Sequence, residues 1–336
     1  MLAHHIKIAL RNLVKRKWIS LTNIAGLSVG MAVCLLISLW IRDEISFDRV
    51  HKNYESIAKV RLNITRNGEI QTTKTVPLPL AQELRSNFGN DFQYIVPSSH
   101  RLPHILSAAD KKLMQKGVYL GSEAPSMFSL NMIEGDASAL TDPRSIVLSA
   151  SAAHIFFGNE DPLGKVMTID ERQNVTVTGV YKDLPDNSTF ADIAFIAPFD
   201  LYLGGETWIT NLPDPWNRSP IQLYVQLKST SSFEQVSDQI KNIVQRKAAE
   251  SDVGKKSAVL LEPMSKWHLY NYRNGSNESG TIRYVKMFAW IAAFVLLLAC
   301  FNFMNLSTAR SEQRAKEVGI RKTVGSLRSQ LIAQFF

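Results

Sequence analysis

The sequence predicts an α+β extracytoplasmic domain of two subdomains, inserted between two transmembrane α-helices. Two stretches without a charged side chain, Ile19–Ile41 with 23 residues and Met287–Leu306 with 20, carry this prediction. At ~1.5 Å per helical residue, each can cross a hydrocarbon core of ~30 Å. The 245 residues between them, 42–286, are mostly polar and alternate short strand and helix patterns, as a folded α+β domain does.

The charge distribution gives the orientation. Residues 1–18 carry five basic side chains and no acid, and residues 307–336 carry six basic side chains and two acids. The whole chain has 38 basic and 30 acidic residues, so 27 and 28 remain for residues 42–286. Short basic flanks stay in the cytoplasm, so both ends are predicted inside and the central domain outside. The near-neutral central domain argues against a nucleic-acid partner, while the basic flanks suit contact with anionic lipid.

Residues 1–18 are predicted to form a cytoplasmic amphipathic helix on the inner membrane surface. Apolar residues recur there at helical spacing, and basic residues follow one another four positions apart. The positions concerned are Leu2, Ile6, Leu10 and Leu13, and Lys7, Arg11 and Lys15. A frayed basic tail is the alternative interpretation.

Residues 19–41 are predicted to be transmembrane helix 1 and not a cleaved signal peptide. The apolar run is longer than the ~7–15 residues of a signal core, and no small-residue cleavage site follows it. Trp18 and Trp40 bracket the run, as aromatic residues do at the membrane interfaces. Residues 287–306 are predicted to be transmembrane helix 2. Both cysteines, Cys34 and Cys300, lie inside these two stretches, so no disulfide is expected in the central domain.

Residues 42–286 are predicted to contain interleaved helices and strands. A helix is expected at 46–59, a second after Ser149 as its N-cap, and a third after a capping box of Ser231 and Glu234. The third helix would place Phe233, Val236, Ile240 and Val244 on its inner face. Strands are expected at 60–64, 93–96, 117–120, 145–148, 174–180, 221–227 and 258–261. The stretches 208–220 and 271–280 are expected to be a loop between subdomains and a connector to the second span.

Two sequence patterns resemble a nucleotide-binding motif and a metal-binding motif, but neither matches in detail. Gly158–Val166 has five residues between its glycines where a P-loop has four, and Val166 stands where Ser or Thr would contact magnesium, so we interpret it as a turn. His100 and His104 have the spacing of metal ligands, but Pro103 breaks a regular helix between them, so we expect solvent-facing loop histidines. No catalytic, cofactor-binding or metal-ligating residue is therefore predicted.

Residues 307–325 follow the second span as a charged cytoplasmic segment, interrupted by Gly319 and Gly325. At 326–336 a further apolar pattern begins, which we interpret as the start of a truncated third transmembrane helix. The chain is therefore expected to be the amino-terminal part of a longer membrane protein.

Two motifs carry a resemblance to a known family. The stretch 145–188, SIVLSASAAHIFFGNEDPLGKVMTIDERQNVTVTGVYKDLPDNS, resembles the periplasmic core domain of MacB/FtsX-type ABC transporter permeases. The stretch 301–330, FNFMNLSTARSEQRAKEVGIRKTVGSLRSQ, is similar to the segment of such permeases that enters the cytoplasm after the second span. The start of the chain, with HHIKIALRNLVKRK and DEISFDRVHKN, resembles the same family, so the likeness covers essentially the whole chain.

This resemblance implies a multi-pass permease subunit of the bacterial inner membrane with its central domain in the periplasm. Such a permease binds no ATP itself and works with a separate cytoplasmic ABC ATPase subunit, as a dimer or pseudo-dimer of permease units, with or without a periplasmic adaptor. The coupling helix of the family corresponds here to Arg314, Lys316, Glu317, Gly319, Arg321 and Lys322. ATP hydrolysis by the partner would move the periplasmic domain, for export or for mechanical work.

Two other classes of protein share parts of this pattern. A two-span sensory receptor with an extracytoplasmic ligand-binding domain has the same topology, but needs a signalling region after the second span. A membrane-anchored hydrolase would also fit the topology, although no motif supports it. The transported substrate is not readable from the sequence.

Overall fold

The computed structural model describes residues 17–248, 256–273, 276–323 and 325. The chain divides into two compact units. One holds the two long helices, and the other is the globular part, Glu44–Ile282.

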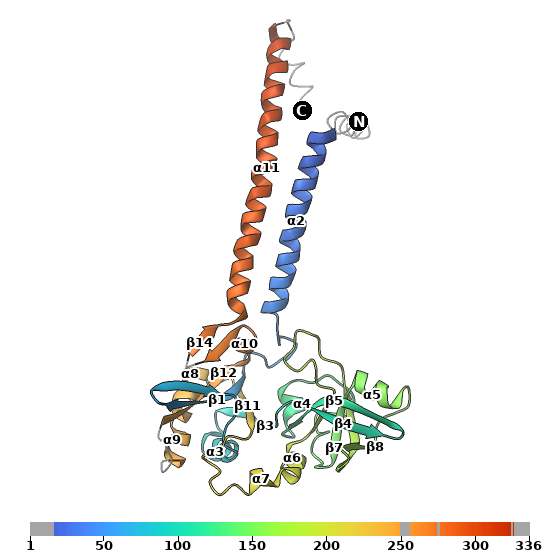
Figure 1. Ribbon diagram of the computed structural model, residues 1–336, viewed down its shortest axis with the longest axis vertical. Helices are drawn as coiled ribbons and strands as arrows, with labels where there is room; N and C mark the ends of the chain where they lie inside the picture. Colours follow the sequence, from blue (N-terminus) through green and yellow to red (C-terminus); the bar gives the residue numbers. More distant parts are fainter. Residues whose placement is uncertain (1–16, 249–255, 274–275, 324, 326–336) are drawn as a thin grey trace. The chain divides into compact units, whose positions relative to one another are not determined.

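The helical unit consists of α2 (Lys17–Ile45) and α11 (Thr281–Thr323), which lie side by side (Figure 1). Ile24–Ile45 in α2 and Thr281–Asn305 in α11 are long and apolar enough to cross a membrane. Most large apolar side chains on these stretches are exposed, so the helices present apolar surfaces suited to lipid or to further helices. With 43 residues, α11 is about 65 Å long and extends well beyond its apolar part.

Small residues bring α2 and α11 into close contact. A Cβ atom added to Gly30 would lie 2.9 Å from Cβ of Ala299, closer than side chains tolerate. One turn further along, Cys34 Sγ donates a hydrogen bond to the carbonyl oxygen of Ala292 over 3.2 Å. Backbones that approach this closely need glycine at the contact, as in other membrane helix pairs.

The first subdomain of the globular unit has a βαββαβ topology. Four antiparallel strands lie in the order β3-β11-β1-β12, with the short β2 paired to β1. In chain order its elements are β1 (Ile57–Arg66), β2 (Glu69–Thr73), α3 (Pro79–Phe88), β3 (Phe92–Ser98), β11 (Gln222–Leu227), α8 (Phe233–Ile240), α9 (Ile243–Lys247) and β12 (Ser257–Pro263). The three helices pack against the sheet, where alternate apolar residues of β1 and β11 form the core.

The second subdomain is inserted between β3 and β11 and closes into a six-stranded barrel. Going around it, the order is β10-β7-β9-β8-β4-β5, and β10 closes the ring by pairing with β5. Its strands are β4 (Leu102–Ala108), β5 (Lys111–Leu120), β7 (Ser145–Ser149), β8 (Val166–Ile169), β9 (Gln173–Tyr181) and β10 (Phe195–Pro198). Their inward side chains, such as Leu106, Ile146 and Phe195, form a separate buried core.

Short elements surround the barrel and the base of the second span. Around the barrel lie α4 (Ala124–Met127), β6 (Met132–Glu134), α5 (Ala150–Phe157), α6 (Phe199–Gly205) and α7 (Thr207–Thr210). After β12 come α10 (Met264–Trp267) and a hairpin of β13 (Tyr270–Arg273) and β14 (Ser276–Ser279), which precede α11.

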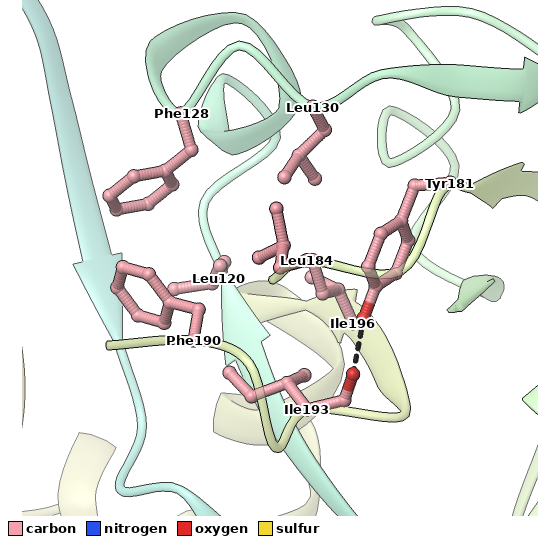
Figure 2. Close-up of a pocket in the computed structure, with 8 residues that line it drawn as sticks. All are labelled: Leu120, Phe128, Leu130, Tyr181, Leu184, Phe190, Ile193 and Ile196. Carbon is pink, nitrogen blue, oxygen red and sulfur yellow. Dashed lines mark hydrogen bonds between the residues drawn. The ribbon is translucent and has the colours of Figure 1, made fainter. Parts of the chain in front are cut away.

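A third buried cluster joins the two subdomains. It combines residues of both sheets, among them Ile57, Val96 and Tyr224, with the loop residues Phe128 and Phe190. Figure 2 shows part of it, where eight apolar or aromatic side chains surround a cavity and the Tyr181 hydroxyl donates a hydrogen bond to the Ile193 carbonyl oxygen over 2.5 Å. The cavity volume is about 10 Å³, the space of about one water molecule. This joint is therefore packed and does not hold a ligand.

Most predicted strands of the central domain are present, each within a residue or a few of its expected bounds. The helix after Ser149 is confirmed as α5, and the Ser149 side chain accepts a hydrogen bond from the Ala152 N–H. The capping prediction for α8 was wrong by one residue, because Ser232 and not Ser231 accepts the hydrogen bond from the Gln235 N–H.

Two other predictions were wrong, those for the segment after α2 and for Gly319. Residues 46–56 form turns and not a helix, because Asp48 adopts a φ of 62° and turns the chain towards the second subdomain. The stretch 271–280 leads into the second span as expected, and its described residues belong to the hairpin of β13 and β14. Gly319 does not interrupt the charged segment, since α11 runs through it to Thr323. Residues 1–16 of the helix expected at 1–18, and the whole expected span at 326–336, lie outside the described residues, while residues 17 and 18 belong to α2.

Candidate functional site

The six residues predicted to contact an ATPase all lie in the last turns of α11. Helical periodicity places positions 314, 317 and 321 on one face, and positions 316 and 319 away from it. Lys316 and Gly319 are exposed. No described atom of this chain lies within 4 Å of a Cβ atom built at Gly319, so the space beside it is open. These positions and the apolar part of α11 therefore belong to one continuous helix.

The turn after α2 forms a buried network of hydrogen bonds with the second subdomain. Asp48 lies three residues beyond the end of α2. Its carboxylate accepts hydrogen bonds from the backbone N–H and the hydroxyl of Thr189, each over 2.6 Å. The Asp48 N–H donates in turn to the Asn187 carbonyl oxygen over 2.8 Å. We call Asp48, His51, Asn187, Ser188 and Thr189 the turn knot.

His51 extends the turn knot towards α4. Its Nδ1 lies 2.6 Å from the carbonyl oxygen of Phe128, and its Nε2 lies 3.3 Å from the hydroxyl of Ser188. Nearby, Asn53 donates from its amide to the Met127 carbonyl oxygen over 3.0 Å. Burial lowers the pKa of His51, although the Phe128 carbonyl and Asp48 act in the opposite direction. The ring is therefore expected to be neutral and to join two loops of the second subdomain to the turn.

The turn knot contains serine, histidine and aspartate but does not have the geometry of a hydrolase triad. In such a triad the carboxylate orients the histidine, whereas here Asp48 bonds to Ser188 and Thr189. Asp48, His51 and Ser188 are only 1%, 2% and 4% exposed, so a substrate has no access to the serine. The arrangement holds the fold together and does not perform nucleophilic catalysis.

His268 connects the base of the first long helix to the segment that precedes the second. Its ring stacks on the ring of Phe47, with centroids 3.7 Å apart, and its Nε2 bonds to the carboxylate of Glu44. The next residue, Leu269, accepts a hydrogen bond at its carbonyl oxygen from the N–H of Ile282 over 2.9 Å. Both helix ends are therefore attached to two adjacent residues after α10. We call Glu44, Phe47, His268, Leu269 and Ile282 the helix-end bracket.

A lysine next to this bracket has an unusual environment. Lys59 on β1 lies over the rings of Trp267, at 4.4 Å from the centroid, and Tyr224, at 5.6 Å. Burial, assisted by the nearby positive charge of Arg61, lowers the pKa of Lys59 to about 7. Arg61 itself forms a buried ion pair of 2.6 Å with Glu262. The face of the first subdomain that contacts the second therefore carries charged side chains next to aromatic rings.

The two superficial motifs have structural roles. In the P-loop-like stretch, Gly158 and Gly164 adopt positive φ values of 64° and 75°, and Lys165 pairs with Glu160. Among the described residues, no group of histidine, cysteine and acidic side chains could hold a metal ion. The expectation of a solvent-facing loop was wrong for His104, which lies on β4, half-buried, with its Nδ1 2.6 Å from Asp170.

Both segments of the turn knot carry recognisable motifs, but the sequence does not predict that the two segments contact each other. The segments 46–53 and 183–188 both belong to stretches that carry the family resemblance, and the structure brings them together. The only signal in the sequence was a set of short polar side chains in each segment, next to apolar runs. Such a set is compatible with many loops, so the pairing could not be deduced.

Comparisons with known proteins agree with this architecture. A scan against protein families matches residues 20–243 to the MacB-like periplasmic core domain. The curated protein "Uncharacterized ABC transporter permease YknZ" of Bacillus subtilis (strain 168) is 25% identical over 206 residues, which cover 60% of this chain and 45% of that protein. The chain thus aligns with less than half the length of this curated relative.

Solved structures also align with the globular part. A domain assigned to a permease of Porphyromonas gingivalis aligns with a TM-score of 0.49 and 20% identity, covering 63% of this chain and 92% of that one. The periplasmic region of MacB from Actinobacillus actinomycetemcomitans aligns with a TM-score of 0.45 and 14% identity, covering 63% and 91%. Because the family match extends over more than half of its residues, the chain belongs to the family of the MacB-like periplasmic core domain.

Proposed function

We propose that this chain is part of the membrane permease subunit of an ABC transporter. In this proposal a separate ATPase subunit hydrolyses ATP, and the permease converts the cycle into movement of its periplasmic domain, for export or for mechanotransmission. The observation that carries it is the family match over residues 20–243, which includes an apolar helix and most of the globular domain. A curated relative named as an ABC transporter permease supports the same class over a sensory receptor.

The proposed topology places α2 and α11 across the bacterial inner membrane. The apolar stretches Ile24–Ile45 and Thr281–Asn305 are long enough, and in the sequence the basic residues precede the first stretch and follow the second. The globular domain then lies in the periplasm and the last turns of α11 in the cytoplasm. Membrane lipid contacts the exposed apolar side chains, and a second permease unit or a periplasmic adaptor completes the assembly.

The proposed contact with the ATPase is the end of α11. About 18 residues of the helix follow its apolar stretch, which corresponds to about 27 Å of regular helix. Open space at Gly319 would let a partner surface approach the helix backbone closely. Positions 317 and 321, four apart, lie on the face of the helix opposite Gly319, so a partner that uses all three positions would have to contact both faces of this end of α11. ATP would be bound by the partner, so no cofactor is assigned to this chain.

Transmission to the periplasmic domain would use the two contacts at the membrane-proximal side. The helix-end bracket ties both helix ends to His268 and Leu269, and the turn knot ties the end of α2 to the second subdomain. A displacement of one helix end against the other would therefore act on both subdomains. Buried, hydrogen-bonded contacts of this kind switch between discrete arrangements more readily than they stretch.

Co-purification tests the ATPase contact. The permease is produced with a soluble ABC ATPase from the same genome, as wild type and with Glu317→Ala and Arg321→Ala together. Loss of the co-purified ATPase, with retained membrane insertion, is expected. Arg283→Ala, a matched loss of charge at the other end of α11, is the control. If the double variant retains the ATPase as well as the control does, the assignment of this site is wrong.

A further inference from the structure

A cavity of about 670 Å³ opens on the barrel subdomain and has no role in the function proposed above. It lies between α6 and strands of the barrel, and its wall is formed by β4, β5, the β8–β9 turn and the start of β9. This volume is within the range of ~300–1,000 Å³ typical of small-molecule sites. By contrast, the cavity at the joint of the subdomains has room for about one water molecule. The larger cavity therefore has room for a small ligand.

Aromatic rings form the floor of this cavity. Tyr119 lies 5.4 Å from Tyr202 and 5.5 Å from His104, measured between ring centroids. The Tyr119 hydroxyl donates to Oε1 of Gln173 over 2.9 Å, and Nε2 of Gln173 donates to the Leu201 carbonyl oxygen over 3.1 Å. The rings are thus held in place before any ligand arrives, which lowers the entropy cost of binding.

Carboxylates stand around this floor. Asp170 accepts a hydrogen bond from the Ile105 N–H over 2.8 Å and lies next to His104, which fixes its position. Glu206 accepts a hydrogen bond from the indole N–H of Trp208 over 2.7 Å. Asp200, in the first turn of α6, adds a third carboxylate to the lining. Each of the first two has lone pairs left for a further donor.

The electrostatic effect of these carboxylates reaches the rings. Burial raises the pKa of Tyr119 and, after burial, the negative charges of Asp170 and Glu206 raise it further. Burial and Glu206 likewise raise the pKa of Tyr202. No positively charged side chain changes the pKa of either hydroxyl to a comparable degree, although Arg144 and Arg172 also line the cavity. Both arginines are exposed, so they belong to the rim and not to the floor.

We propose that this cavity binds an organic cation, whose amine or amidinium group lies against Tyr119 and Tyr202 and pairs with Asp170 and Glu206. Aromatic faces and carboxylates together are the usual receptors for such groups, because the ring quadrupole and the negative charge both favour a cation. The arginines at the rim add preference for a ligand that carries an anionic or carbonyl group farther from its amine. The site is independent of ATPase coupling and stands even if that proposal fails.

Benzamidine, benzamide and benzoate test the proposal, because the three have similar shape and differ in charge. Binding to the full chain in a nonionic detergent is measured by ligand-observed NMR titration. Benzamidine is expected to bind at least about tenfold more tightly than benzamide, the difference that one or two charge-assisted hydrogen bonds supply, and benzoate more weakly still. Equal affinity for the cation and the neutral amide would overturn the proposal.

Variants locate the site. Asp170→Asn and Glu206→Gln, separately and together, are expected to weaken benzamidine binding about tenfold or more while leaving benzamide binding unchanged. Glu171→Gln is the matched control, since Glu171 is adjacent to Asp170 but pairs with Lys112 outside the cavity lining. Thermal unfolding checks that each variant is folded. If Asp170→Asn unfolds the barrel, Glu206→Gln still decides, because unchanged benzamidine affinity in that variant contradicts the assignment.

Discussion

The carboxylate of Asp48 binds both the N–H and the hydroxyl of Thr189, a residue 141 positions later in the chain. This pair connects the turn after the first long helix to a loop of the inserted barrel. Asp48 is buried, Thr189 is half-buried, and Asp48 adopts the left-handed conformation with φ of 62°. At Asp48, therefore, a left-handed backbone conformation, a carboxylate side chain and burial occur together.

Replacing Asp48 tests the importance of this contact for stability. Asp48→Ala is expected to lower the free energy of unfolding by about 3 kcal/mol, because buried donors of Thr189 and Ser188 lose their acceptor and alanine tolerates the positive φ poorly. Asp48→Asn should cost less, since its amide oxygen still accepts and asparagine tolerates this conformation. Denaturant unfolding of the full chain in detergent measures both.

Asp110→Ala, at an exposed residue of the β4–β5 hairpin, is the control for the loss of one carboxylate. Equal unfolding free energies for Asp48→Ala and Asp110→Ala would mean that the turn knot contributes nothing.

The lowered pKa of Lys59 predicts a pH-dependent effect of its removal. In the folded chain this amine titrates at about 7, while in the unfolded chain it keeps its ordinary value of about 10.4. Between these two pH values the unfolded state binds more protons than the folded state, so the free energy of unfolding rises with pH. The destabilisation that the buried Lys59 causes is therefore complete below about pH 7 and diminishes as the pH rises. Lys59→Met should therefore gain stability relative to wild type as the pH falls from 10 to 6.

Melting temperatures of the two proteins from pH 6 to pH 10 measure this difference. Lys182→Met, at an exposed lysine, should show a difference from wild type that does not vary with pH in the same way. A constant difference between Lys59→Met and wild type over the whole range would contradict an altered titration of Lys59.

The close approach of α2 and α11 at Gly30 can be tested by cross-linking. Ala292→Cys places a second thiol next to the native Cys34, whose Sγ lies 3.2 Å from the Ala292 carbonyl oxygen, in a background with Cys300→Ser. Oxidation should form an intramolecular disulfide in membranes. Adding Gly30→Val should reduce its yield severalfold, because the valine side chain would collide with Ala299.

Val29→Ile serves as the control, since Val29 is 63% exposed and points away from the contact. A cross-link that forms equally well with Gly30→Val would show that the helices do not pack through this residue.

Local signals explain which parts of the fold could be predicted. The strand β7, the cap at Ser149 and the helix α5 follow from alternation and capping within 13 residues, and the structure has all three. The apolar stretches likewise needed only composition. Both kinds of signal are contained in a short window of sequence, so long-range contacts did not alter them.

The errors have the opposite origin. The turn at 46–56 has helical apolar spacing, but Asp48 and His51 gain hydrogen bonds with a distant loop that a helix would not allow. The barrel closes through the pairing of β10 with β5, two strands separated by 74 residues, which no local pattern announces. The capping error between Ser231 and Ser232 arose because both residues are competent N-caps, and Asp91 binds the hydroxyl of the first.

The coupling segment remains a prediction from resemblance. Its residues are in one helix with the second apolar stretch, which differs from the interruption expected at Gly319. A glycine in a helix costs only about 1 kcal/mol, so the strong helix formers around it keep the helix continuous.

The central claim of this account is that ATP bound by a partner moves the two periplasmic subdomains against each other. Spin labels are placed at two exposed positions, Ser86→Cys on α3 and Asn159→Cys after α5, with Cys34 and Cys300 replaced by alanine. They report the distance between the two subdomains in the permease bound to its ATPase. Pulsed dipolar spectroscopy should show a distance distribution that shifts when a non-hydrolysable ATP analogue is added, and a smaller shift with Asp48→Asn. Identical distributions with and without the nucleotide, in a complex that hydrolyses ATP, would contradict the account.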